Sequence, residues 1–201
     1  VELVKTLTSS RPDLLREAWK LGITKEFLPE FDLAMETTQE TVHHMYTVGE
    51  HILHTLLEVR PDRILRLTML LHDIGKPYMK TMDADGVAHF KGHPEKSSEL
   101  ANEILHRLKF DNDTIRKVTK LVRYHDHRMP VTPAHVRRAV HEIGEDLFPL
   151  YLEVRRADVA AQSMYQHKEK VADIDGVEKL YHEIMERKEC VSLKMLAVTG
   201  K

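Results

Sequence analysis

The apolar and polar residues of this chain follow a helical pattern almost from end to end. Apolar side chains recur with the spacing of helices that bury one face, and alternating runs rich in β-branched residues are nearly absent. We therefore expect an all-α fold. The predicted helices cover about residues 12–20, 46–59, 61–75, 94–109, 112–125, 132–143, 145–164 and 173–188.

Prolines and glycines mark several ends of these helices. Thr132 is a good N-cap residue and Pro133 suits the first helical position, so a helix is predicted to begin there. Gly75 followed by Pro77 predicts the end of the strongly apolar helix before it, with Gly75 as a C-cap glycine.

Two stretches lack the helical pattern. Residues 23–41 contain closely spaced turn signals and predict short turns at a domain boundary. Residues 78–92 carry an Asp85-Gly86 pair between two short segments without helical character. Because Asp-Gly favours a two-residue hairpin turn, we expect a short β-hairpin flap near residues 78–91.

Composition limits the class of protein. The 201 residues are 42% hydrophobic and 31% charged, which fits one large globular domain and argues against disorder. No apolar run approaches the ~20 residues of a membrane span, so no membrane partner is expected. The single cysteine, Cys190, excludes a disulfide scaffold and a thiolate metal site, and it favours a reducing, cytoplasmic location. The 14 histidines beside only 8 glycines suggest helices that carry imidazole ligands.

Charge is unevenly distributed, although the formal net charge is only −2. Residues 105–138 contain nine Lys or Arg and three Asp, a local excess of six positive charges. Such an excess is typical of a solvated helix face that is balanced elsewhere, and equally of a surface that faces phosphates. The sequence leaves both interpretations open.

The sharpest chemical signal is the adjacent pair His72-Asp73, which ends an apolar helix. The carbonyl end of a helix favours a cation, and imidazole and carboxylate are suitable metal ligands. The alternative is a surface pair near a turn, which the apolar run before it disfavours. The pair is therefore the first candidate for a metal site.

Asp158 is the second signal, because it lies in the middle of an apolar stripe on its predicted helix. The stripe consists of Leu147, Leu150, Tyr151, Val154 and Ala161. A carboxylate on such a face costs several kcal/mol unless it is paired or metal-bound. An ion pair with Arg155 or Arg156 is the alternative to a metal ligand.

The other histidines are weaker candidates. His125 lies on the apolar face of its helix, where a satisfied core histidine is the more common role. His93 opens a helix after the predicted hairpin, and a single histidine there is usually structural. Periodicity does not place His51 at the apolar centre of its helix, and His44 and His54 are weaker still.

Taken in order along the chain, these residues resemble the HD superfamily of metal-dependent phosphohydrolases, which has an all-helical fold. The resemblance rests on the order His51, then His72-Asp73, then Asp158. His93 and His125 match the extra histidines of members that bind two metals.

The motifs are most similar to those of the HD domain joined to bacterial tRNA nucleotidyltransferases, the CCA-adding or poly(A) polymerase-like enzymes. These motifs are Tyr46-Thr47-Val48-Gly49-Glu50-His51, Leu71-His72-Asp73-Ile74-Gly75-Lys76-Pro77, Phe90-Lys91-Gly92-His93 and Arg155-Arg156-Ala157-Asp158.

The resemblance implies three parts: a helical neck or connector over 1–40, the HD domain over 41–165, and a C-terminal helical extension over 166–201 that is cut short. The sequence departs from the family in having no Gly-Ser motif followed by an Asp-x-Asp pair, the mark of the polymerase head. We therefore expect that this chain by itself adds no nucleotides. Because the sequence opens on Val1, we also expect a fragment of a longer protein.

The resemblance further implies one or two divalent metal ions. His51, His72, Asp73 and Asp158 would hold the first, and this set of nitrogen and oxygen ligands suits Mn, Ni, Co, Fe, Zn or Mg. The two extra histidines, His93 and His125, would either hold a second metal bridged by Asp73 or contact the phosphate directly.

The expected reaction is hydrolysis of a phosphomonoester or phosphodiester by a metal-generated hydroxide. Asp73 is a candidate catalytic residue that also orients the water, and Lys76 would neutralise charge on the phosphoryl group, unless it is only a solvated lysine at a helix end. Lys76, His44 and Arg128 are the candidate substrate-binding residues.

The resemblance implies nucleotide or RNA-end substrates, including 2′,3′-cyclic phosphates, with tRNA as a partner. Two alternatives remain at this stage. One is a non-catalytic tRNA-binding or RNA-binding body of a nucleotidyltransferase, which the basic stretch 105–138 favours. The other is a stand-alone nucleotidase or alarmone hydrolase. The sequence leaves the oligomeric state open.

Overall fold

The computed structural model describes residues 2–42 and 45–187, and these residues form an almost entirely helical fold. The predicted all-α class is confirmed. The helices are α1 (Glu2–Leu7), α2 (Leu15–Lys20), α3 (Pro29–Glu36), α4 (Val48–Glu58), α5 (Arg63–Leu71), α6 (Lys76–Met79), α7 (His93–Arg107), α8 (Asn112–Tyr124), α9 (Pro133–Ile143), α10 (Phe148–Ala160) and α11 (His167–Glu186), with 3-10 turns η1 (Pro12–Leu14) and η2 (Thr24–Glu26).

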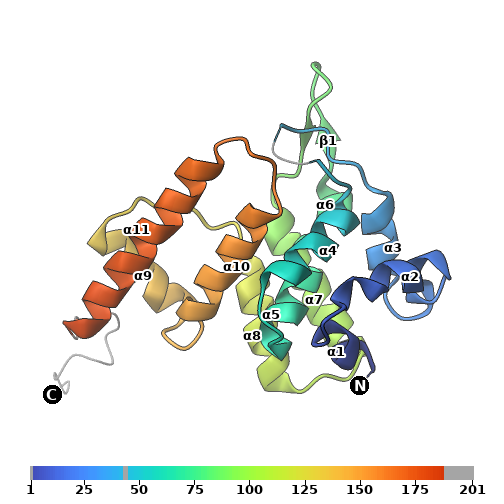
Figure 1. The fold of residues 1–201 in the computed structure, drawn as a ribbon, viewed down its shortest axis with the longest axis horizontal. Helices are drawn as coiled ribbons and strands as arrows, with labels where there is room; N and C mark the ends of the chain where they lie inside the picture. Colours follow the sequence, from blue (N-terminus) through green and yellow to red (C-terminus); the bar gives the residue numbers. More distant parts are fainter. Residues whose placement is uncertain (1, 43–44, 188–201) are drawn as a thin grey trace, which may run out of the picture.

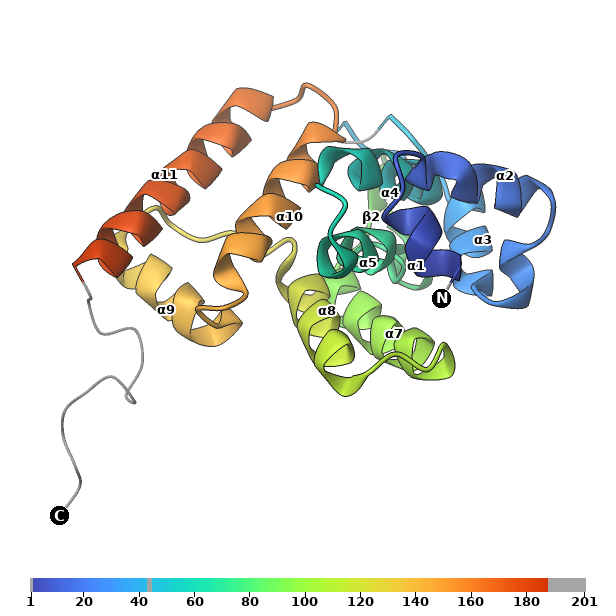
Figure 2. The same ribbon diagram turned by 60° about the horizontal axis from the view of Figure 1, so that its bottom comes forward.

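Two hydrophobic cores meet at α10. The larger core joins α1 to α5 with α7 and α8, and the smaller one joins α9 and α11 to the other side of α10. Val154 and Ala157 of α10 belong to the first core, whereas Tyr151, Leu152 and Val159 belong to the second. Figures 1 and 2 both show α10 between α9 and α11 on one side and the rest of the bundle on the other. α10 is therefore buried on two opposite faces.

Helix α5 lies at the centre of the larger core. It contacts α1, α4, α7, α8 and α10, and every residue from Leu65 to Leu71 is buried. The carboxylate of Asp62 caps its first turn by accepting hydrogen bonds from the backbone N–H groups of Ile64 (2.9 Å) and Leu65 (3.0 Å). Because α5 is surrounded by other helices, the residues that follow it enter the interior of the protein.

The predicted hairpin is present as a two-stranded antiparallel sheet of β1 (Thr81–Met82) and β2 (Ala88–His89). Thr81 pairs with His89, and Met82 pairs with Ala88. The turn contains Gly86, whose φ of +77° is in the left-handed region that favours glycine. Figure 1 shows this hairpin projecting beyond the ends of α4 and α6.

The prediction that Gly75 is the C-cap glycine of the apolar helix is wrong. Helix α5 already ends at Leu71, and Gly75 has a φ of −84°. Gly75 instead allows α7 to approach, because a Cβ atom there would lie 2.5 Å from the backbone nitrogen of Ser97. Pro77 does not follow a helix end but lies in the first turn of α6, where its missing N–H costs nothing.

Several helix boundaries also differ from those predicted. Helix α3 occupies part of the segment predicted as turns, because Pro29 starts a helix instead of breaking one. Helix α10 begins at Phe148 instead of residue 145, and α11 begins at His167 instead of residue 173. Thr132 precedes α9 as predicted, but its hydroxyl contacts the ring of His135 (2.8 Å) and caps no backbone N–H.

Within the described residues, no helix combines the length and the apolar character needed to cross a membrane. Cys190 and the end of the predicted C-terminal extension lie outside the described residues.

Candidate metal centre

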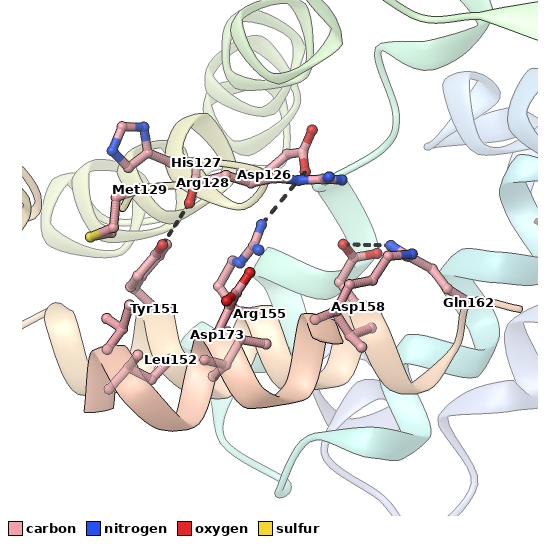
Figure 3. A pocket seen from close by; sticks show the side chains of 14 residues that line it. Asp126, His127, Arg128, Met129, Tyr151, Leu152, Arg155, Asp158, Gln162 and Asp173 are labelled. Atoms are coloured by element: carbon pink, nitrogen blue, oxygen red, sulfur yellow. Dashed lines mark hydrogen bonds and ion pairs between the residues drawn. The ribbon is translucent and has the colours of Figure 1, made fainter. Parts of the chain in front are cut away.

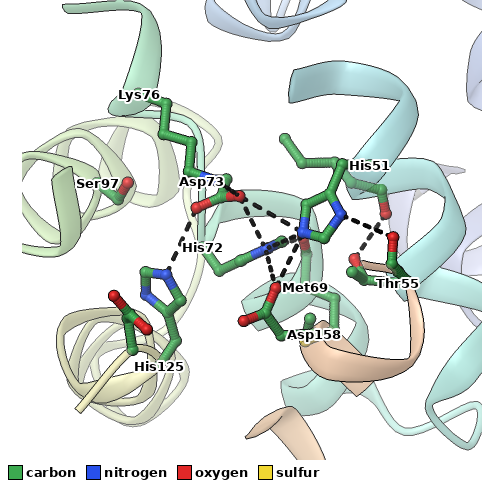
Figure 4. Close-up of polar contacts among 12 residues, drawn as sticks. His51, Thr55, Met69, His72, Asp73, Lys76, Ser97, His125 and Asp158 are labelled. Atoms are coloured by element: carbon green, nitrogen blue, oxygen red, sulfur yellow. Dashed lines mark hydrogen bonds and ion pairs between the residues drawn. The ribbon is translucent and has the colours of Figure 1, made fainter. Parts of the chain in front are cut away.

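Four histidines and two aspartates from five helices converge below the hairpin. They come from five places in the fold, because His72 and Asp73 both follow α5: the middle of α4, the end of α5, the start of α7, the end of α8 and the last part of α10. The residues are His51, His72, Asp73, His93, His125 and Asp158. Figure 4 shows five of them, all except His93, pointing toward one another. The structure thus brings together all six residues that the sequence nominated as metal ligands.

The first group consists of His51, His72 and Asp158, which are all buried. The Nε2 atom of His51 lies 2.9 Å from Oδ1 of Asp158 and 3.4 Å from Nε2 of His72. The ligand atoms of the three residues all lie within 4.8 Å of one another, which is close enough for a single ion to contact them all.

The second group consists of Asp73, His93 and His125. The Oδ1 atom of Asp73 lies 3.3 Å from Nε2 of His93 and 3.4 Å from Nε2 of His125. The two Nε2 atoms are 3.2 Å apart. This group lies nearer the hairpin, since His93 directly follows the segment that returns from β2.

Asp73 also connects the two groups. Its other oxygen, Oδ2, lies 3.5 Å from Nε2 of His51 and 3.3 Å from Nε2 of His72. One carboxylate therefore faces two histidines of each group, in the position from which it can bridge two cations.

Backbone carbonyl groups determine which nitrogen of three histidines faces the centre. The Nδ1 atoms lie 2.8 Å from Met69 O for His72, 2.9 Å from Phe90 O for His93 and 2.7 Å from Val122 O for His125. A carbonyl oxygen can only accept, so each Nδ1 carries a proton and each ring turns its Nε2 atom toward the centre. This arrangement is the usual support for metal-binding histidines.

The donor atoms fit a divalent cation. Within the described part of the chain, Oδ1 of Asp73 has no hydrogen-bond partner of good geometry, although the residue is only 1% exposed. Buried lone pairs that face one another without donors between them are unfavourable unless a cation joins them. A set of imidazole nitrogens and carboxylate oxygens, without sulfur, suits borderline and hard divalent metals.

The electrostatics of the centre keep both carboxyls ionised. Burial alone raises the pKa of Asp73, but its electrostatic interactions with His72 and Lys76 bring it well below the usual range. Burial likewise raises the pKa of Asp158, and the hydrogen bond to His51 lowers it well below that range. A site that stabilises two carboxylates in this way attracts positive charge.

Lys76 is not a solvated lysine at a helix end, because it is only 5% exposed. Its Nζ atom lies 2.7 Å from Oδ2 of Asp73 and donates to Oε1 of Gln39 at 2.9 Å. The ring of Phe90 lies on its other side, 5.5 Å from Nζ. That alternative interpretation of Lys76 is therefore wrong, and its ammonium group belongs to the centre.

Asp158 does not pair with either arginine proposed as its alternative partner. Arg155 points to the carbonyl oxygen of His125 (3.2 Å), and Arg156 pairs with Asp175 and Glu178 on α11. The second oxygen of Asp158 accepts a hydrogen bond from Nε2 of Gln162 at 3.0 Å.

Sequence reasoning missed two polar side chains of this region. Gln39 and Gln162 hold Lys76 and Asp158, respectively, through their amides. Neither follows a motif or a periodic pattern, so the sequence offered no signal for them. His51 was ranked as weak, yet it is completely buried at the heart of the first group.

An open cavity of about 460 Å³ lies over the centre. Asp73, Lys76 and His125 form part of its floor, and residues 88–92 of the hairpin form part of its wall. Arg128, a predicted substrate-binding residue, lies at its edge with a largely exposed side chain that pairs with Asp126. His44, the other such residue, lies outside the described residues.

Comparison with known proteins gives the same assignment for most of the chain. The family model described as HD domain matches residues 41–160. The chain is 37% identical to the A-adding tRNA nucleotidyltransferase of Deinococcus radiodurans over 163 residues, which is 77% of this chain and 37% of that protein. It is 34% identical to the CC-adding tRNA nucleotidyltransferase of Thermus thermophilus over 164 residues, which is 78% of this chain and 37% of that protein.

The chain is also similar, at lower sequence identity, to an enzyme of a different kind. The chain is 26% identical over 180 residues to the bifunctional uridylyltransferase/uridylyl-removing enzyme of Streptomyces coelicolor, covering 80% of this chain and 20% of that protein. The chain thus spans little more than a third of the two curated tRNA nucleotidyltransferases and less of the third relative.

Proposed function

The chain belongs to the HD domain family, and we propose that it is a metal-dependent phosphohydrolase acting on nucleotides or RNA ends. The proposed reaction is hydrolysis of a phosphomonoester or phosphodiester, such as a 2′,3′-cyclic phosphate. One observation carries the proposal: four imidazole Nε2 atoms converge on the carboxylates of Asp73 and Asp158 beneath an open cavity.

We propose that the two groups of ligands hold two divalent cations that share Asp73. Cations held there would supply Lewis acidity toward a phosphoryl oxygen and a hydroxide nucleophile near neutral pH. Mn, Ni, Co, Fe, Zn and Mg all suit such a set of nitrogen and oxygen ligands.

The chain's own residues would prepare the site for a phosphate. Lys76 holds the carboxylate of Asp73 in one orientation and also lines the cavity, so its charge is available near a phosphoryl group. Arg128 at the cavity edge would attract the anionic substrate. His93 is the least buried of the four histidines and faces the cavity from the hairpin side.

The similarity to A-adding and CC-adding tRNA nucleotidyltransferases supports a role in RNA metabolism. We propose that the chain is the HD portion of a tRNA nucleotidyltransferase-like protein. An RNA 3′ end would then be its natural phosphate ester. The identity of 37% and 34% over more than three quarters of the chain supports this assignment.

Elemental analysis of protein purified without chelator tests the proposal. We expect near-stoichiometric divalent metal in the wild type and little in Asp73→Ala. The exposed hairpin variant Asp83→Ala, which changes an aspartate outside the centre, should keep its metal. Turnover of 2′,3′-cyclic nucleotides, nucleoside monophosphates and a generic phosphodiester is then measured for all three proteins.

Two outcomes would overturn the proposal. One is full turnover by Asp73→Ala, which would place the reaction elsewhere. The other is a wild type that takes up no metal even after loading with Mn, Ni or Mg, which would make the histidines structural.

A second function, RNA binding without catalysis, is favoured by the surface of α8 and α9. Arg116 and Lys117 of the basic stretch pair with Asp113, but Lys120, Arg123 and Arg138 form no ion pair with the described residues. Lysine and arginine side chains without an acidic partner are available to bind phosphate groups.

Fluorescence anisotropy with a labelled tRNA, measured over a range of salt concentrations, tests this second function. Binding through the α8 surface predicts an affinity that falls steeply with salt and a shallower slope for Lys120→Gln/Arg123→Gln. Lys5→Gln, which removes an exposed lysine paired with Glu2, is the matched control. Salt-independent or absent binding would exclude this function.

A further inference from the structure

A second pocket lies between α10 and α11, beside the metal centre. Figure 3 shows the side chains that line it, Asp158 of the centre among them. Arg155 and Asp158 of α10 line one side, Lys170 and Ile174 of α11 line the other, and residues 126–129 close one end. This pocket is distinct from the cavity over the centre, but Asp158 belongs to both.

The pocket and the cavity are separate but adjacent. Asp126, Arg128, Asp158 and Gln162 line both of them. A ligand whose reacting phosphate lies over the metal centre can therefore extend into the pocket without leaving the surface of the chain.

Three cationic side chains from three separate segments gather in the pocket. Arg128 comes from the loop after α8, Arg155 from α10 and Lys170 from α11. Burial lowers the pKa of Lys170, and the charges of Arg128 and Arg155 act in the same direction, opposed by those of Asp158 and Asp126. Three acids also line the pocket: Asp126 lies within 3.5 Å of both arginines, Asp173 is exposed, and Asp158 accepts a hydrogen bond from Gln162.

A hydrogen-bonded relay sets the position of Lys170 relative to the centre. Its Nζ atom donates to Oε1 of Gln162 at 2.8 Å, and Nε2 of the same amide donates to Oδ2 of Asp158 at 3.0 Å. Only two hydrogen bonds and one amide group separate the ammonium group from a candidate metal ligand. The cation is therefore held at a fixed, short distance from the place where the reacting phosphate would lie.

We propose that this pocket binds a second phosphate group of the substrate, the one that belongs to the preceding nucleotide of an RNA 3′ end. The inference rests on the proposed phosphohydrolase function and names its substrate class: an oligonucleotide end is preferred to a mononucleotide. A guanidinium fork and a lysine point charge are the side chains that proteins use for phosphate. A polynucleotide carries its next phosphate one nucleotide away from the reacting one.

Steady-state kinetics with two substrates tests the inference. One is a mononucleoside 2′,3′-cyclic phosphate, and the other is a dinucleotide that ends in the same cyclic phosphate. We expect kcat/KM to be at least tenfold higher for the dinucleotide. Lys170→Gln should reduce the value for the dinucleotide at least tenfold more than the value for the mononucleotide, whereas Lys170→Arg should restore part of the preference.

Lys168→Gln is the matched control, because Lys168 is exposed on the same helix and does not line the pocket. It should leave the preference for the dinucleotide unchanged. Equal kcat/KM values for the two substrates in the wild type, or an equal loss for both in a Lys170→Gln protein that melts like the wild type, would overturn the inference.

A binding measurement separates this inference from the proposed function. Calorimetry without turnover compares a dinucleotide 3′-phosphate with a nucleoside 3′-monophosphate. Tighter binding of the dinucleotide that weakens in Lys170→Gln supports the pocket, even if neither cyclic phosphate is hydrolysed and the proposed reaction fails. Equal affinities for the two ligands would overturn the proposal that the pocket binds a second phosphate group, whatever the kinetics show.

Discussion

The Nζ atom of Lys76 lies 2.7 Å from Oδ2 of Asp73, and both side chains are buried. The two residues are three positions apart, with the close approach at Gly75 between them. A lysine that would be solvated at an ordinary helix end is therefore part of the candidate centre. It holds the carboxylate that faces both groups of histidines.

This pair leads to a prediction for Lys76→Met. We expect kcat at saturating metal to fall on the order of 100-fold, because one preorganised positive charge near the phosphoryl group is lost. Lys80→Met, which changes a lysine of the next turn that pairs with Glu40, should retain near-normal kcat. Equal rates for Lys76→Met and the wild type would show that Lys76 acts only on the structure.

The two groups of ligands predict two metal ions per chain. His125→Ala removes a ligand of the second group only, so the stoichiometry from elemental analysis should fall from two ions to one. His89→Ala, on the exposed hairpin, is the control and should keep both ions. One ion in the wild type would mean that His93 and His125 serve another purpose.

The close approach at Gly75 predicts a stability defect. In Gly75→Ala the new methyl group would lie 2.5 Å from the backbone nitrogen of Ser97, and backbone atoms of α7 have little freedom to move. Overpacking of this kind costs about 1–3 kcal/mol in the free energy of unfolding. Because Asp73 is two residues away, metal content should fall as well.

Gly22→Ala is the comparison for Gly75→Ala. Gly22 has a φ of +71° but no neighbour that a Cβ would meet, so only backbone strain is expected there. It should lower the melting temperature without changing the metal content. A Gly75→Ala protein with wild-type stability and full metal content would contradict the predicted steric clash with Ser97.

Asp111, the N-cap of α8, predicts a pH dependence of stability. Hydrogen bonds from the backbone N–H and the hydroxyl of Thr114 lower the pKa of this carboxyl from 3.8 to about 2. A carboxyl whose folded pKa is lowered stabilises the folded state above its unfolded pKa. This contribution is lost as the pH falls from about 3.8 toward about 2.

Urea unfolding of the wild type and Asp111→Asn checks this dependence. The asparagine keeps a capping oxygen but has no ionisable group in this range. The difference in free energy of unfolding between the two proteins should shrink as the pH falls from 5 toward about 2. A difference that stays constant over this range would mean that the carboxylate charge contributes nothing.

Parts of the candidate site could be predicted from the sequence because they depend on local pattern. An apolar run that ends in His72-Asp73 places this pair at the end of a buried helix, and both residues are indeed buried. A carboxylate on the apolar face of a helix needs an ionic or metal partner, and for this reason the sequence indicated Asp158 as a candidate ligand. The same local reasoning predicted the hairpin from its Asp-Gly turn.

Other parts depended on how helices pack, which local pattern does not contain. His51 seemed peripheral because its own helix has a different apolar centre, but α4 is covered by α3, α5 and α10 on several sides. The sequence around Gly75 indicated a helix end, but in the structure the missing side chain of Gly75 allows α7 to pack close to it. The amides of Gln39 and Gln162 matter only because of the side chains that the fold brings next to them.

The sequence by itself determined the all-α class through its helical period, the hairpin through its Asp-Gly pair, and the candidate ligands through the resemblance of its motifs to the HD superfamily. The tertiary structure decided which ligands share a group. His51 and Asp158 are 107 positions apart and meet at 2.9 Å only because α4 and α10 pack against each other. The physical reason is that periodicity orients a side chain about its own helix axis, whereas the packing of one helix on another decides which side chains meet.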